Sequence, residues 1–81
     1  MDRSDAETLV KDAIARVVPG ADLSRLGPED PFRDALEFDS LDFLNFVEIL
    51  SERSGLHIDE EDYPRLTTLK DAGEFLVARA P

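Results

Sequence analysis

Ser40 is the side chain in this sequence that is best placed to take part in covalent chemistry. It stands in the segment Asp39-Ser40-Leu41-Asp42, where an apolar helical pattern begins. A serine hydroxyl becomes a nucleophile when a neighbouring base removes its proton, but the one histidine, His57, lies beyond the far end of that pattern. Ser40 therefore needs a second protein in order to react. The alternative is that it only satisfies free amides at a helix start, where serine is common.

No other group of residues predicts a metal or phosphate site. The run Asp59-Glu60-Glu61-Asp62 lacks the alternating oxygen ligands and the central glycine of a calcium loop, so we predict no structural metal. The four glycines are isolated, which excludes a glycine-rich phosphate loop. Cysteine is absent, which excludes disulfides and thiolate chemistry. We interpret His57 as a turn residue.

The net charge of −10 is concentrated in one part of the chain. Residues 28–62 carry twelve acidic and two basic residues, whereas the segments on either side are close to neutral. Nucleic acids and anionic membranes bind basic surfaces, so this distribution argues against both. It favours a partner with a basic surface, although acidic side chains also keep small domains soluble.

The chain is short, at 81 residues, and 42% of them are hydrophobic. This predicts one folded domain, residues 1–81, with little room for a deep catalytic pocket, and so no enzyme. No apolar run approaches the roughly 18 residues of a membrane span, and the N-terminus does not resemble a secretory signal. We expect a cytoplasmic protein, and a monomer because no heptad seam is exposed.

The chemistry at Ser40 depends on three predicted helices. Ser4 and Glu7 form a capping box, and the first helix after them has one apolar stripe, made of Leu9, Val10, Ala13, Ile14, Val17 and Val18. The second helix runs from Ser40 to Arg53, with Asp39 as its N-cap and Gly55 as its C-terminal cap. The last is capped by Thr67 or Thr68 and carries the apolar residues Leu69, Ala72, Phe75 and Leu76.

The segments between these helices are less regular. Residues 21–37 have no period and read as a long packed loop, with four apolar anchors: Leu23, Leu26, Phe32 and Leu36. Residues 59–62 predict a short turn of helix at most, because Pro64 limits it. The expected fold is all-α, a small four-helix bundle of three main helices and one short helix.

Angular positions on the second helix separate two faces. At about 100° per residue, the core stripe contains Phe43, Phe46, Val47 and Leu50. On the opposite side, the two leucines Leu41 and Leu44 lie among the polar residues Asn45, Glu48 and Glu52. An apolar pair flanked by carboxylates is typical of a transient docking face. Alternatively, the 21–37 loop covers the two leucines.

The segment Phe38-Asp39-Ser40-Leu41-Asp42, preceded by Phe32-Arg33-Asp34-Ala35-Leu36, resembles the 4′-phosphopantetheine attachment motif of acyl carrier proteins. The similarity continues through Ile58-Asp59-Glu60-Glu61-Asp62 and Leu66-Thr67-Thr68-Leu69, and it spans roughly residues 4–79. In this family the Asp-Ser-Leu tripeptide opens the second helix of a four-helix bundle. The resemblance implies a stand-alone carrier of acyl thioesters in fatty acid, polyketide or related lipid metabolism.

The resemblance also implies a role for each matching position. Ser40 is the attachment site, to which a phosphopantetheinyl transferase joins the arm from coenzyme A with the help of Mg²⁺. Partner enzymes with basic patches would recognise Asp39, Leu41, Asp42, Leu44, Glu48 and Glu52, with Asp59, Glu60, Glu61 and Asp62 as a second acidic patch. The core residues Phe43, Phe46, Val47 and Leu50 would line an acyl pocket.

Several positions depart from the family pattern. Glu37 replaces a usual glycine three residues before the serine, so the loop lacks that residue's freedom at positive φ. Asn45 replaces a common glutamate, Glu48 replaces a small aliphatic residue or methionine, and Phe43 fills a position that is often small or polar. These departures predict a specialised carrier of short, polar or aminoacyl cargo, or one whose acyl chain stays exposed. The rival interpretations are a peptidyl or aminoacyl carrier and an unmodified acidic interaction module.

Overall fold

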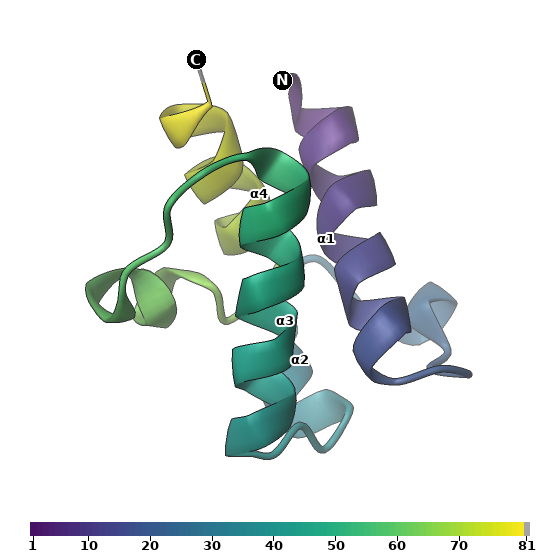
Figure 1. Ribbon diagram of the computed structural model, residues 1–81. Coiled ribbons are helices and arrows are strands. Elements are labelled where there is room, and N and C mark those ends of the chain that lie inside the picture. Colours follow the sequence, from purple (N-terminus) through teal and green to yellow (C-terminus); the bar gives the residue numbers. More distant parts are fainter. Residues whose placement is uncertain (81) are drawn as a thin grey trace.

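A computed structural model describes residues 1–80, and this part of the chain is helical without named strands (Figure 1). The elements are α1 (Arg3–Val17), the 3₁₀ helix η1 (Leu23–Arg25), α2 (Phe32–Ala35), α3 (Ser40–Ser54), the 3₁₀ helix η2 (Glu60–Arg65) and α4 (Leu69–Arg79). The three long helices and the short helical segments confirm the predicted small helical bundle. Within residues 1–80, none of the helices has the length and apolar character needed to span a membrane.

Helix α1 begins earlier than the sequence pattern predicted. Asp2, not Ser4, is the N-cap, and its side chain accepts a hydrogen bond from the Asp5 amide at 2.8 Å. The expected capping box of Ser4 and Glu7 is therefore wrong. The buried stripe also includes Ala6, and it continues through Val10, Ala13 and Ile14. The other residues of the predicted stripe, Leu9, Val17 and Val18, are partly buried against the core.

The core forms where α1 packs against both α3 and α4. Aromatic side chains cluster near the start of α3, which is the lower end of this helix in Figure 1. Phe46 is fully buried, and its ring centroid lies 5.1 Å from that of Phe32 and 6.1 Å from that of Phe38, both with edge-on geometry. Edge-on pairs add to the stabilisation that burial provides. This cluster joins α3 to the segment that leads into it.

The segment 21–37 is more ordered than the predicted loop. It contains η1 and the single turn of α2, which periodicity cannot reveal because each is shorter than two helical turns. Its backbone is tied to the start of α4: the Phe32 amide donates to the Thr67 carbonyl at 3.1 Å, and the Lys70 amide donates to the Pro28 carbonyl at 2.9 Å. Phe32 and Leu26 are buried, which confirms them as anchors.

The caps of α3 and α4 agree with the sequence. Asp39 caps α3, and Gly55 ends it with a positive φ of 73°. Of the two candidate threonines, Thr68 caps α4, and its hydroxyl accepts from the Asp71 amide at 3.0 Å. The predicted limit at Pro64 is wrong, because η2 continues through this residue to Arg65. A short 3₁₀ helix tolerates the proline better than the interior of an α-helix, where the ring would break the repeating hydrogen bonds.

Candidate functional site

The approach to Ser40 is fixed by the way α2 ends. The Phe38 amide donates to the Arg33 carbonyl at 2.8 Å, and the Glu37 amide donates to the Asp34 carbonyl at 3.4 Å. These two bonds form a Schellman motif, in which the residue after the cap takes a left-handed conformation. Here that residue is Glu37, with φ of 55°, so a glutamate adopts a backbone conformation that glycine reaches at lower cost.

A reciprocal cap then sets the start of α3. The Asp42 amide donates to the Asp39 carboxylate at 2.8 Å, and the Asp39 amide donates to the Asp42 carboxylate at 3.3 Å. Ser40 is the first residue of the helix and is exposed. Within residues 1–80, no acceptor contacts the amides of Ser40 and Leu41. Ser40 thus presents an accessible hydroxyl where two free N–H groups and the positive end of the helix dipole favour an anion.

A hollow of about 490 Å³ opens beside Ser40. Its wall combines residues from α2, α3, η2 and the segment between η2 and α4: Arg33, Ser40, Phe43, Leu44, Glu60, Tyr63, Pro64, Leu66 and Thr67. Phe43 contacts two other lining residues. The Arg33 guanidinium carbon lies 4.5 Å from the Phe43 ring centroid, and the Tyr63 ring packs edge-on with its centroid 5.3 Å from that of Phe43. The hollow therefore has apolar surface together with charged and hydroxyl groups.

The four predicted pocket residues lie in different surroundings. Phe43 lines the hollow beside Ser40, and Val47 lines a neighbouring hollow of about 440 Å³. Phe46 and Leu50 are fully buried and line neither. The sequence argument missed Arg33 and Tyr63 as lining residues. A signal for Arg33 was present, since it is one of only two basic residues in the segment 28–62.

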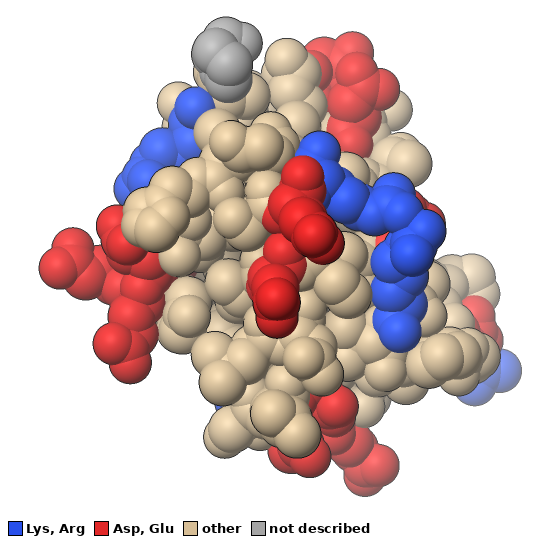
Figure 2. Space-filling view, in the orientation of Figure 1, with Lys and Arg blue, Asp and Glu red and all other residues tan. Residues whose placement is uncertain are grey.

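The outer face of α3 is open to solvent. Leu41 is 67% exposed and Leu44 is 49% exposed, so the segment 21–37 does not cover them. Asn45, Glu48 and Glu52 are exposed on the same helix, and its N-cap Asp39 is also exposed. Figure 2 shows acidic side chains over the middle of α3 and over η2, with basic side chains nearer to α1 and α4. The structure thus presents an apolar pair among carboxylates, as the sequence indicated.

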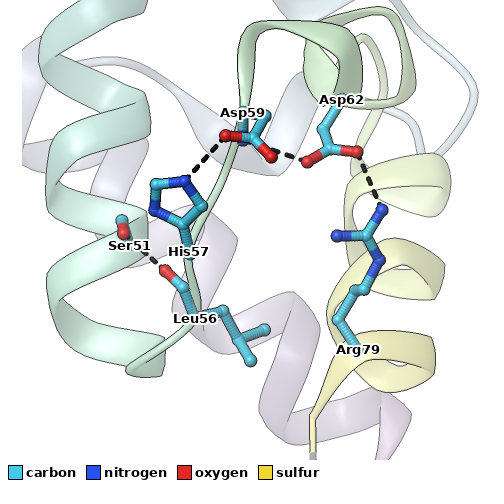
Figure 3. Close-up of polar contacts among 6 residues, drawn as sticks. All are labelled: Ser51, Leu56, His57, Asp59, Asp62 and Arg79. Atoms are coloured by element: carbon cyan, nitrogen blue, oxygen red, sulfur yellow. Dashed lines mark hydrogen bonds and ion pairs between the residues drawn. The ribbon is translucent and has the colours of Figure 1, made fainter.

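The predicted second acidic patch divides into outward and inward members. Asp59, Glu60 and Glu61 are exposed, and Asp59 contacts the His57 ring at 2.7 Å. Asp62 is only 7% exposed. Its carboxylate accepts from the Asp59 amide at 3.0 Å and pairs with Arg79 at 2.8 Å (Figure 3).

The contacts of Asp62 give it a structural role. The Asp59 amide lowers the pKa of the Asp62 carboxyl, the Arg79 guanidinium lowers it further, and burial acts in the opposite direction. The net effect is a lowered pKa, so the Asp62 carboxylate stays ionised and its pairing with Arg79 connects η2 to α4. Between α3 and η2, the Ser51 hydroxyl donates to the Leu56 carbonyl (Figure 3).

Comparisons with known proteins assign this arrangement to a family. A family model described as the phosphopantetheine attachment site matches residues 8–76. An acyl carrier protein of Rubrobacter xylanophilus is 34% identical over 77 residues, which cover 95% of this chain and 94% of that protein. The chain belongs to the acyl carrier protein family. A second acyl carrier protein, of Desulforapulum autotrophicum, is 31% identical over 70 residues, covering 86% of this chain and 91% of that protein.

Membership of the acyl carrier protein family implies 4′-phosphopantetheine as the covalently attached cofactor. The surroundings of Ser40 fit such a group. Its hydroxyl is exposed, two amides at the helix start have no acceptor within the described part of the chain, and the adjacent hollow has room for part of a flexible arm. The residues present therefore agree with the chemistry of the cofactor.

Proposed function

We propose that Ser40 Oγ is the attachment point of 4′-phosphopantetheine and that the chain carries acyl groups as thioesters on this arm. The observation that carries the proposal is the position of Ser40: it is exposed, first in α3, and framed by the reciprocal cap of Asp39 and Asp42. When bound, the arm supplies the thiol that this cysteine-free chain lacks. The pathway we propose is a specialised branch of fatty acid, polyketide or related biosynthesis.

The residues around Ser40 position the arm and do not catalyse. The reciprocal cap and the Schellman motif fix the backbone on both sides of the serine, so the hydroxyl is presented at a constant place. The amides of Ser40 and Leu41 would hold the phosphate by hydrogen bonding. His57 contacts Asp59 beyond the C-terminal end of α3, and we propose that no base within this chain activates Ser40. A phosphopantetheinyl transferase supplies that step.

The exposed face of α3 is the surface that we propose partner enzymes bind. The docking face consists of Asp39, Leu41, Leu44, Glu48 and Glu52, with Glu60 and Glu61 at its edge. Asp62 is left out because it is buried and paired, and Asp42 acts first as a cap. An acidic rim around two leucines fits a basic partner surface, with charge guiding the encounter and the leucines adding contact area. Such binding is fast and weakens with salt.

The test is the intact mass of the purified protein before and after incubation with coenzyme A, Mg²⁺ and a phosphopantetheinyl transferase. The wild type should gain one phosphopantetheine, and Ser40→Ala should gain none. Because Ser40 is exposed and is not the N-cap, the variant should unfold within about 0.5 kcal/mol of the wild type. A folded wild type that stays unmodified with several transferases would instead support the unmodified acidic interaction module.

A further inference from the structure

Arg33 is a cation without a counter-ion at the hollow beside Ser40. The segment 28–62 carries twelve acidic residues, yet no carboxylate of residues 1–80 lies within ion-pair distance of this guanidinium. The Arg33 side chain also makes no hydrogen bond within the same residues. No fully buried polar side-chain atom in this part of the chain lacks a partner, so the partly buried guanidinium keeps its N–H groups open to solvent.

Phe43 fixes the place of this guanidinium. Its ring is buried, and the guanidinium carbon of Arg33 lies 4.5 Å from the ring centroid. A guanidinium held against the face of a ring keeps its N–H edge free for a bidentate anion. Phe43 also follows Ser40 by three positions on α3, and side chains at this spacing are neighbours on a helix surface. Arg33 is therefore held beside the serine, and both line one hollow.

The carboxylates close to Ser40 do not neutralise Arg33. Asp39 and Asp42 accept from each other's backbone amides in the reciprocal cap, which holds both at the helix start. Glu60 also lines the hollow, but it is exposed and lies beyond ion-pair distance of Arg33. A cation that stays unpaired among so many acidic residues is available to an anion that is attached after the chain has folded.

We propose that Arg33 binds the phosphodiester that joins Ser40 Oγ to the 4′-phosphopantetheine arm, and that it thereby holds the start of the arm at the hollow. Arg33 is a positioning residue in this role, because it acts on the attached arm and not on the chemistry of attachment. The inference rests on the proposed function, because it requires an arm on Ser40.

A phosphodiester has the charge and the geometry to pair with Arg33. It carries a single negative charge and two non-bridging oxygens, so it can accept from the fork of a guanidinium while backbone amides at the start of α3 also donate to it. Its covalent bond to Ser40 keeps it near Arg33 at a high effective concentration, whereas a carboxylate on a partner protein would have to bind anew at every encounter. The partly buried position of Arg33 also weakens screening by salt.

The experiment observes the phosphate directly, in the loaded protein without any acyl group. The wild type, Arg33→Gln and Arg16→Gln are prepared in the unmodified and in the pantetheine-loaded form, and intact mass verifies the loading. Arg16 is exposed on α1 and lies outside the hollow, so its variant removes the same charge away from the site. Phosphorus NMR locates the phosphodiester resonance in each loaded protein, with the urea-denatured loaded protein as the reference. Melting temperatures are measured for both forms.

In the wild type and in Arg16→Gln, the phosphorus resonance should lie away from its position in the denatured reference. In Arg33→Gln this displacement should shrink. The gain in melting temperature on loading should also be smaller in Arg33→Gln by roughly 4 °C, a size that one charge-assisted hydrogen bond can produce in a domain of this length. Equal displacements and equal gains in the wild type and Arg33→Gln would overturn the proposal. Equal losses in Arg16→Gln and Arg33→Gln would also overturn it, because they would assign the effect to net charge.

Two further measurements separate an ionic contact from a structural role of Arg33. The difference between the wild type and Arg33→Gln should shrink as salt is raised to 1 M, where the screening length is about 3 Å, and a difference unaffected by salt would contradict the ion pair. If Arg33→Gln does not fold, the wild type alone decides. Loading should slow the exchange of the Arg33 guanidinium protons with water, and an unchanged exchange rate would overturn the proposal.

The intact mass distinguishes failure of this inference from failure of the proposed function. If Ser40 accepts no arm, the mass shows this before any other measurement, and the proposed function fails together with the inference. If the arm is attached and neither the phosphorus resonance nor the melting temperature responds to Arg33, the inference alone fails.

Discussion

Asp39 and Asp42 cap one another across Ser40, with amide-to-carboxylate distances of 2.8 Å and 3.3 Å. Each carboxylate accepts from one amide at the helix start, and the amides of Ser40 and Leu41 are left without an acceptor among residues 1–80. The same residues that predict a recognition surface therefore also build the local structure. Substitutions here change folding and charge together unless the two effects are separated by design.

Replacing Asp39 by alanine should lower the free energy of unfolding by about 1 kcal/mol, because the N-cap acceptor is lost. Asp39→Asn keeps an acceptor oxygen and removes the charge, so its stability should stay near that of the wild type. Chemical denaturation of both variants measures this difference. Transferase kinetics on the folded Asp39→Asn protein then report the contribution of the charge alone. Equal destabilisation by both variants would show that charge, and not capping, holds the helix start.

Glu37→Gly should stabilise the protein by up to about 1 kcal/mol. Glycine occupies the left-handed region without the clash that Glu37 accepts at φ of 55°, and part of the gain is offset by the greater freedom of glycine in the unfolded chain. Denaturation midpoints provide the measurement. Glu37→Ala is the matched control, because it removes the same negative charge and keeps Cβ. If alanine stabilises as much as glycine, relief of charge repulsion is the cause.

The sequence predicted the parts of this fold that repeat over several turns. The spacing of Phe43, Phe46, Val47 and Leu50 places them on one side of a helix, and the structure buries all four. Short elements escape such reasoning. The turn of α2 is held by contacts between Phe32 and residues far along the chain, including the Thr67 carbonyl, which no local pattern contains.

The sequence predicted which side chains belong to the site better than it predicted their contacts and burial. Ser40 and its exposed leucines follow from helix geometry. The burial of Asp62 could not be predicted in this way. The run of four acidic residues does not indicate which of them, in η2, pairs with Arg79 of α4. The cation over Phe43 likewise depends on how α2 packs against α3, which is a tertiary relationship.

Phe46→Ala should cost about 3–5 kcal/mol, because the fully buried ring contacts the aromatic cluster before α3. That loss is a large share of the roughly 4–12 kcal/mol expected for a domain of 81 residues, so the variant should be partly unfolded at room temperature. Phe46→Leu keeps most of the apolar volume and should lose less. Circular dichroism during denaturation measures both. A stable alanine variant would indicate that Phe46 faces an open pocket and not the core.

Acid should release the contact between Asp62 and Arg79. The pKa of Asp62 is lowered in the folded state from its ordinary value of 3.8, so its contribution to stability is fully present above that value. It is lost as pH falls through the lowered, folded-state pKa. Asp62→Asn should therefore be less stable than the wild type at pH 7, and the difference should shrink as the pH drops below 3.8. Denaturation midpoints between pH 2 and pH 7 check this, and a constant difference would contradict the pairing.

Leu41→Ala should leave folding unchanged and weaken partner recognition. Leu41 is 67% exposed, so its loss should alter stability by less than about 0.5 kcal/mol. If it enters a partner pocket, kcat/KM of the transferase should fall by about fivefold or more, as expected for a central contact residue. Val77→Ala is the control, because Val77 is a 39% exposed apolar residue on α4, away from the docking face. An equal loss of transferase efficiency in both variants would show that the effect does not arise from contact at α3.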